Sequence, residues 1–213
     1  MDASFANSLA EAVAAKLLQG TFIEVEASGR HVHLSRKEID ILFGKGHKLT
    51  KLRDLSQPGQ FVSKEKVTLI GPKGVLRDVA VLGPERSETQ VEISQTDAIM
   101  LGIPAPVRES GHLDGTPPII LAANRAVKIE KGVIIAKRHI HMSLQDAKRF
   151  QVQDKEMAQV KVFGTRPLIF DDVVIRVSPH YQTYMHIDYD EANACGFTKG
   201  TLAMIVKKGY LGE

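Results

Sequence analysis

Two pairs of histidines carry the clearest chemical signal in the sequence. Each pair stands in one of two similar hexapeptides, RHVHLS at 30–35 and RHIHMS at 138–143, with one residue between the histidines. Residues i and i+2 of a β-strand point to the same face, so the two imidazoles of each hexapeptide should converge. Such a pair suits zinc, and although a single pair is a weak signal, its duplication strengthens the prediction. The pairs are His31 and His33, and His139 and His141.

An internal repeat supplies a third ligand for each pair. Aligning VEISQTDAIMLGI (91–103) with MHIDYDEANACGF (185–197) superposes Glu92 on His186. Three protein ligands leave one coordination position open, which is the pattern of catalytic rather than structural zinc sites. The predicted sites are His31, His33 and Glu92, and His139, His141 and His186.

The remaining candidates for metal binding or catalysis lack a partner in the repeat. His47 lies in a Gly/Lys-rich stretch and His112 in a connecting stretch, so both are expected to face solvent, and His180 is unmatched in the first half. Cys195 could accept an acyl group. The repeat aligns it with Leu101, however, which favours a small buried apolar residue.

Short strands are expected to position these side chains. Runs rich in β-branched residues, punctuated by Gly and Pro, predict strands at 22–27, 66–71, 76–83, 89–94, 126–136, 158–164, 171–178 and 201–208. A short helix is expected after each hexapeptide and after each segment that carries a third ligand. Two repeats are too few for a solenoid, so the pattern favours a pseudo-symmetric pair of small β-barrels or sandwiches.

The expected organisation has three parts. Residues 1–20 repeat an apolar residue every four positions and predict an amphipathic helix, which either packs on the protein or docks on a partner. Residues 21–107 form the first repeat and residues 108–213 the second, with strands free to be exchanged between the halves.

Composition excludes several classes of protein. A single cysteine excludes an internal disulfide, and the formal charge of +3 comes with 6% aromatic residues and no Trp, unlike a nucleic-acid platform. No apolar run approaches the roughly eighteen residues of a membrane span, and the N-terminus lacks the features of a secretory signal. We therefore expect a cytoplasmic protein.

The chain resembles the PduL-type phosphotransacylases, the phosphate propanoyltransferase family. Besides the two hexapeptides, the resemblance rests on LTKLRDLSQPGQF (49–61), VLGPERSETQVEIS (81–94) and LGIPAPVRESG (101–111). It implies a mainly β chain with short helices, forming two pseudo-symmetric small β-barrel domains with a dimetal active site between them. It also implies two Zn²⁺ ions per chain, held by the six ligands that the repeat predicts.

The resemblance assigns roles to further residues. Arg86 is the implied phosphate-binding catalytic residue, and the implied contacts with coenzyme A are Ser28, Gly29, Arg30 and Asn193. Two positions depart from the family's pattern, since Gly29 replaces a common Asn and Tyr184 replaces a common Glu.

The implied activity is phosphate acyl transfer, which interconverts acyl-CoA (propanoyl-CoA or acetyl-CoA) and phosphate with acyl-phosphate and CoA. The alternatives are a zinc-dependent hydrolase and a non-enzymatic zinc-binding module. The expected partners are acyl-CoA and inorganic phosphate, not nucleic acid or membrane. A homo-oligomer stays open, as do bacterial microcompartment shell or cargo partners of the N-terminal helix, which would place the cytoplasmic enzyme inside a microcompartment.

Overall fold

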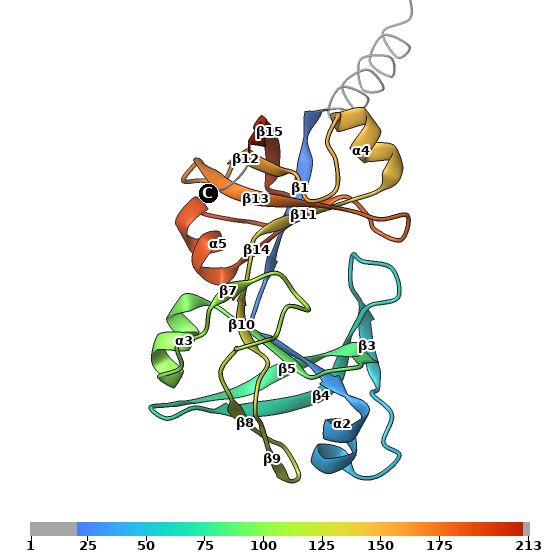
Figure 1. Cartoon of the computed structure of the whole chain (residues 1–213), viewed down its shortest axis with the longest axis vertical. Coiled ribbons are helices and arrows are strands. Elements are labelled where there is room, and N and C mark those ends of the chain that lie inside the picture. Colours follow the sequence, from blue (N-terminus) through green and yellow to red (C-terminus); the bar gives the residue numbers. More distant parts are fainter. Residues whose placement is uncertain (1–20, 211–213) are drawn as a thin grey trace, which may run out of the picture. The chain divides into compact units, whose positions relative to one another are not determined.

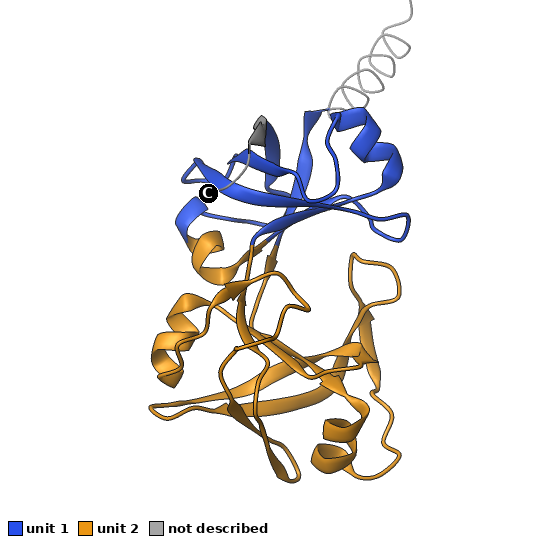
Figure 2. Ribbon diagram, in the orientation of Figure 1, with its two compact units in different colours: residues 1–26, 138–186, 194–213 blue, residues 27–137, 187–193 orange. Residues whose placement is uncertain are grey.

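The structure, a computed structural model, describes residues 21–210, so the helix predicted for residues 1–20 lies outside the described residues (Figure 1). The described chain is mainly β, with fifteen strands and four short helices. It divides into two compact units (Figure 2). Unit 1 takes described residues 21–26, 138–186 and 194–210, and unit 2 takes 27–137 and 187–193.

Unit 1 is built on a closed six-stranded barrel with the strand order β1-β14-β11-β13-β12-β15. At its centre, β11 runs antiparallel to β14 and parallel to β13. The strands are β1 (Ile23–Ser28), β11 (His139–Met142), β12 (Met157–Val162), β13 (Leu168–Val177), β14 (Tyr184–Asp188) and β15 (Leu202–Tyr210).

Unit 2 is built on an open nine-stranded sheet with the order β7-β10-β6-β2-β5-β4-β8-β9, to which β3 adds by pairing with β4. Here β2 runs antiparallel to β6 and parallel to β5, as β11 does between its own neighbours. The strands are β2 (His31–Ser35), β3 (Lys51–Asp54), β4 (Phe61–Ile70), β5 (Val75–Arg86), β6 (Gln90–Ile93), β7 (Val107–Arg108), β8 (Ile119–Ala122), β9 (Ala126–Ile129) and β10 (Val133–Ala136).

The four described helices all begin directly after a strand that carries a predicted ligand, as expected from the sequence. A serine stands at the N-cap of α2, α3 and α4. Ser94 and Ser143 accept the backbone N–H groups of Asp97 and Asp146, as short polar N-cap residues commonly do, whereas the Ser35 side chain accepts no helix N–H. The helices are α2 (Arg36–Phe43), α3 (Gln95–Leu101), α4 (Leu144–Phe150) and α5 (Tyr189–Cys195).

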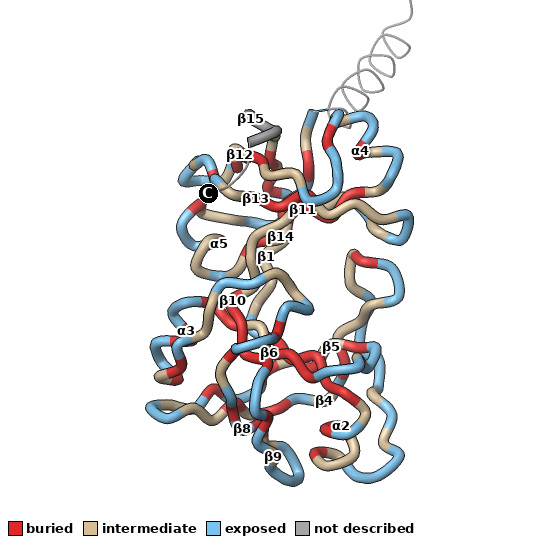
Figure 3. The backbone as a smooth tube through the Cα atoms, in the orientation of Figure 1, coloured by how far each residue is buried: buried red, intermediate tan, exposed pale blue. Residues whose placement is uncertain are grey.

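Alternation along the ligand strands separates the core from the predicted sites. Val32 and Leu34 are fully buried in the core of unit 2, and Ile140 and Met142 are fully buried in unit 1. The histidines between them point to the opposite face of each strand. Figure 3 shows the buried backbone concentrated along the central strands.

The predicted fold class is confirmed as mainly β with short helices and barrel-type sheets, closed in unit 1 and open in unit 2. One predicted strand, 126–136, is instead two strands, β9 and β10. Between them Gly132 adopts a φ of 127°, and a Cβ there would lie 2.5 Å from the carbonyl oxygen of Thr89. A turn that demands glycine thus divides the apolar run.

The order of the elements along the chain interleaves the two units. Strands β7 to β10 follow residue 106 in the sequence, yet they belong to the sheet of unit 2, where β10 pairs in parallel with β6. The division of the sequence into repeats at 21–107 and 108–213 stays a prediction. Among the described residues, no helix combines the length and apolar character needed to cross a membrane.

Candidate metal centres

Strand pairing brings the third predicted ligand beside each histidine pair. In unit 2, the register of β2 and β6 places His31 opposite Glu92. In unit 1, the register of β11 and β14 places His139 opposite His186. The ligand atoms within each set all lie within 4.8 Å of one another. We call the sets the His–His–Glu triad (His31, His33, Glu92) and the three-histidine triad (His139, His141, His186).

In the His–His–Glu triad, both imidazoles face one carboxylate. The Nε2 atom of His31 lies 3.5 Å from Oε2 of Glu92, and Nε2 of His33 lies 3.8 Å from Oε1. The Nδ1 atom of His31 lies 2.8 Å from the carbonyl oxygen of Gly29. A carbonyl oxygen only accepts, so Nδ1 of the neutral ring donates and Nε2 stays available as a ligand.

Burial and mutual charge perturb all three groups of this triad. Burial alone would raise the pKa of Glu92, but the neighbouring His31, His33 and Arg86 outweigh it and hold that pKa well below its ordinary value. Burial would lower the pKa of His31, but the Glu92 carboxylate outweighs burial and raises it. Burial and then the charge of His31 lower the pKa of His33. An anionic carboxylate beside a neutral imidazole is the ionisation that metal binding requires.

A hydrogen-bond network orients Glu92 from outside the triad. The Gln90 amide donates to Oε1 of Glu92 and, at 2.8 Å, to Oγ of Ser110. Ser110 donates to the same carboxylate oxygen at 3.2 Å, and Gln90 is itself fixed by the Gly111 N–H. Arg86 Nη1 donates to Ser110 at 3.2 Å. Arg86 and Glu92 are therefore joined through a single hydroxyl group.

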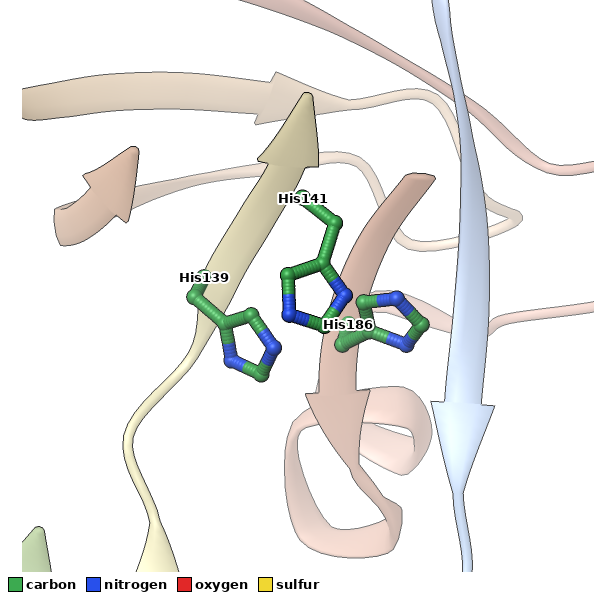
Figure 4. Close-up of side chains that lie close together, drawn as sticks. All are labelled: His139, His141 and His186. Carbon is green, nitrogen blue, oxygen red and sulfur yellow. The ribbon is translucent and has the colours of Figure 1, made fainter. Parts of the chain in front are cut away.

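In the three-histidine triad, the rings converge from β11 and β14 (Figure 4). The ring centroids of His139 and His141 lie 4.6 Å apart, and that of His186 lies 5.1 Å from the first and 4.8 Å from the second. Oε2 of Glu26 lies 3.7 Å from Nδ1 of His186, and the Tyr181 ring lies 4.1 Å from that of His141. A carboxylate near Nδ1 favours the tautomer in which Nε2 of His186 is unprotonated and available as a ligand.

A hollow of about 260 Å³ in unit 2 is lined by both Arg86 and the ligand His33. Its other walls are formed by two glycines, two prolines and one glutamine, so the hollow has room for a small molecule beside the guanidinium and His33. These walls are Pro58, Gly59, Gln60, Gly83 and Pro84.

Comparison with known proteins gives a consistent result. Residues 24–198 match the family model described as phosphate propanoyltransferase. The chain belongs to the phosphate propanoyltransferase family. Among curated relatives, the phosphate propanoyltransferase of Clostridioides difficile (strain 630) is 59% identical over 203 residues, covering 95% of this chain and 97% of the relative. That of Enterococcus faecalis (strain ATCC 700802 / V583) is 60% identical over 205 residues, covering 94% and 97%.

Membership of the phosphate propanoyltransferase family confirms the resemblance and makes the chain an acyltransferase enzyme. The donor sets of the two triads also suit the zinc ions expected from the sequence. Imidazole nitrogen and carboxylate oxygen are both ordinary zinc donors, and three ligands with a fourth direction left open form the catalytic arrangement. His31, His33 and Glu92 would hold one ion, and His139, His141 and His186 the other.

The predicted coenzyme A contacts all lie in unit 2. Arg30 forms a bidentate ion pair with Asp97, at 2.8 and 3.0 Å. Gly29 packs so closely on the Tyr189 ring that a Cβ would lie 2.9 Å from it, and its carbonyl group orients His31. Ser28 is half-buried at the end of β1, whereas Asn193 is exposed on α5. Gly29 and Arg30 thus have structural partners, and contact with coenzyme A stays a prediction for all four.

The residues set aside in the sequence belong to neither triad. His112 and His180 are exposed, as is typical of solvent-facing histidines. His47, expected to face solvent, is instead half-buried because its Nε2 lies 2.9 Å from Oε1 of Glu65. Cys195 is fully buried, in agreement with the small apolar role expected of it.

Gln90, Ser110, Glu26 and Tyr181 are the site residues that sequence reasoning missed. Gln90 could have been found, because it lies two residues before Glu92 on the same strand face. Ser110, Glu26 and Tyr181 come from segments whose spacing gives no hint of their partners.

Proposed function

We propose that the chain transfers an acyl group between coenzyme A and inorganic phosphate, with propanoyl and acetyl groups as the expected acyl chains. The observation that carries this proposal is the position of Arg86, which lines the same hollow as His33 and is hydrogen-bonded through Ser110 to Glu92. Membership of the phosphate propanoyltransferase family supports the same reaction.

In this reaction a phosphate oxygen forms a bond to the acyl carbon of the thioester while the carbon–sulfur bond breaks and the CoA thiolate leaves. Arg86 offers a planar pair of N–H donors that matches a phosphate group. Its positive charge also opposes the negative charge that grows on the reacting groups. Pro58 and Pro84 form apolar walls beside it.

We also propose that each triad holds one Zn²⁺ ion. Bound zinc would supply an electrophile that polarises oxygen and stabilises a thiolate. The protein's part is to set the ligand directions: Gly29 fixes the ring of His31, and Gln90 with Ser110 fixes the Glu92 carboxylate.

One assay tests the proposed reaction against its alternatives. Purified protein is mixed with acetyl-, propanoyl- or butanoyl-CoA, with and without phosphate, and free thiol and acyl-phosphate are both measured. We expect CoA release that requires phosphate and equals the acyl-phosphate formed. Release without phosphate would instead indicate a hydrolase, and no release at all would indicate a binding module.

We propose in addition that residues 1–20 are a docking element for other proteins of a bacterial microcompartment. The support is the apolar repeat of Phe5, Leu9, Val13 and Leu17, which would present one face to a partner. A chain lacking residues 1–20 should keep its turnover but lose co-localisation with a microcompartment shell. Loss of folding on deletion would show that the segment belongs to the structural core.

A further inference from the structure

The helices that follow the ligand strands are capped in two different ways. At α3, Ser94 and Asp97 form a direct capping box: the Ser94 N–H donates to the carboxylate at 3.3 Å, and the Asp97 N–H donates to the hydroxyl at 3.2 Å. At α5, Asp188 and Glu191 exchange the same two bonds at 3.0 and 2.8 Å. Each of these boxes joins residues of one local segment.

At α2, which follows the first histidine pair, a threonine from another strand enters the box. The backbone N–H of Ser35 donates to Oγ1 of Thr89 at 2.9 Å, and the Thr89 hydroxyl donates to Oε2 of Glu38 at 2.9 Å. Ser35 Oγ donates to the same carboxylate oxygen. All three residues are buried. Thr89 lies directly before β6, the strand that carries Glu92.

At α4, which follows the second histidine pair, the same arrangement recurs in unit 1. The backbone N–H of Ser143 donates to Oγ1 of Thr183 at 3.3 Å, and the Thr183 hydroxyl donates to Oδ2 of Asp146. Thr183 lies directly before β14, the strand that carries His186. The two bonds of the threonine, one accepted from a serine N–H and one donated to a carboxylate, are the same in both copies, which argues against an accidental contact. The serine hydroxyl differs, because Ser35 Oγ donates to Glu38 whereas Ser143 Oγ accepts from the Asp146 N–H at 3.0 Å.

The spacing from clamp to ligands is also the same in both units. The serine lies four residues after the first histidine of the pair and the acid three residues further, in HVHLSRKE (31–38) and HIHMSLQD (139–146). The threonine lies three residues before the third ligand, in TQVE (89–92) and TYMH (183–186).

This spacing places each threonine just beyond the paired part of its ligand strands. The register of β2 and β6 runs from His31 opposite Glu92 to His33 opposite Gln90, and the Thr89 bonds follow at the next step. A slip of one residue turns every side chain of a strand to the other face. Such a slip would remove Glu92 from the side of the sheet that carries the histidines.

We propose that Thr89 and Thr183 are positioning residues, each of which holds the register between the histidine-pair strand and the third-ligand strand of its own triad. The clamp does so by making the helix cap after one strand depend on a hydroxyl group from the other. The inference rests on the proposed metal centres. It adds the two threonines and two acidic residues, Glu38 and Asp146, to the residues that position the ligands.

The test measures zinc binding to metal-free, full-length protein by competition with a chelator. Each triad is measured alone, in a His139→Ala background for the first and a His31→Ala background for the second. Thr89→Val, which keeps the shape but loses the hydroxyl, should weaken zinc binding at the His–His–Glu triad by about tenfold to a hundredfold, the usual effect of removing an outer partner of a metal site. Thr183→Val should do the same only at the three-histidine triad.

Conservative and matched variants separate positioning from general stability. Thr89→Ser and Thr183→Ser keep the hydroxyl and should keep the affinity of both triads. The control Thr116→Val removes another buried hydroxyl of unit 2, one that bonds Leu113 O and the Gly132 N–H. It should lower the melting temperature without changing zinc affinity. Glu38→Ala and Asp146→Ala break the far end of each clamp and give a second reading where a valine variant fails to fold.

Three outcomes would overturn the clamp. They are unchanged zinc affinity in both valine variants, an equal loss at both triads from one valine variant, and the same loss in Thr116→Val. Wild-type protein that binds no zinc would overturn the clamp together with the metal centres. Protein that binds two ions and responds to the clamp variants, yet transfers no acyl group, would overturn only the proposed function.

Discussion

Arg86 is the residue that offers the most direct test of the proposed chemistry. It ends β5, lines the hollow beside His33 and donates to Ser110, so its guanidinium is held next to the His–His–Glu triad. In the sequence, its counterpart segment PHYQTYM (179–185) contains no arginine. A role in building the sheet would be expected in both halves, whereas a substrate contact need occur only once.

We predict that Arg86→Lys and Arg86→Ala keep the fold and both metals but lower the rate by about a hundredfold to a thousandfold, the usual loss for one transition-state contact. An ammonium cannot reproduce the planar fork of donors. The measurement is steady-state rate against phosphate concentration, with metal content and melting temperature beside it. Arg77→Ala, on the exposed face of the same strand, is the control. Near-normal turnover and phosphate affinity in Arg86→Lys would remove Arg86 from the mechanism.

The protonation of His31 predicts how zinc binding depends on pH. The Glu92 carboxylate raises the pKa of His31, so this ring carries a proton in the metal-free protein at pH values where His33 is already neutral. A metal must displace that proton, and its affinity should therefore fall as the pH falls. Glu92 contributes no proton in the same range, because its pKa is held low.

We expect zinc binding to the His139→Ala variant, which retains only the His–His–Glu triad, to release up to one proton between about pH 5.5 and 6.5, below the range in which zinc-bound water ionises. Calorimetry in two buffers with different ionisation enthalpies measures this number. Zinc binding that releases no proton over this range would show that the neighbouring Glu92 carboxylate does not keep His31 protonated.

At the scale of elements, each sheet has a hairpin in which a glycine packs directly against the last carbonyl group of a helix. In unit 2, the Lys73 N–H donates to the carbonyl oxygen of Leu101 at the end of α3, and a Cβ on Gly71 would lie 2.3 Å from that oxygen. In unit 1, a Cβ on Gly164 would lie 2.1 Å from the carbonyl oxygen of Cys195, at the end of α5. Helix-terminal carbonyls need partners, and here only glycine lets the hairpin approach them.

We predict that Gly71→Ala and Gly164→Ala each lower the free energy of unfolding by about 1–3 kcal/mol, because the added methyl group forces the helix end away from the hairpin. Urea denaturation measures the loss as a shift in midpoint at constant slope. Gln145→Ala, on the exposed face of α4, should change stability by no more than about 0.5 kcal/mol. If the glycine variants match that control, the contact is not a packing constraint.

At the scale of the whole molecule, each triad lies wholly within one compact unit. The two metal centres should therefore fill independently. We predict about two zinc ions per chain by elemental analysis, with His31→Ala and His139→Ala each removing about one and the double variant removing both. His180→Ala, at an exposed histidine outside both triads, should keep two. A single substitution that empties both centres would mean that the ligands are shared.

The sequence by itself determined the contents of both triads. Period-two alternation placed His31 and His33 opposite the apolar Val32 and Leu34, and the internal repeat matched Glu92 with His186. These are local patterns, because the face that a side chain occupies follows from its position along its own strand. Short helices after the ligand strands were predictable for the same reason, because the residues that form an N-terminal helix cap lie within four positions of one another.

Only the tertiary structure decided which segments meet. Pairing of β10 with β6 draws residues that follow position 106 into unit 2, where Ser110 reaches Glu92, Arg86 and Gln90. The tertiary structure also placed Asp97 beside Arg30 and brought Thr89 to the cap of α2. Backbone pairing between distant strands uses the same N–H and C=O groups in every residue, so the side-chain pattern of one strand specifies its buried face but not its neighbour.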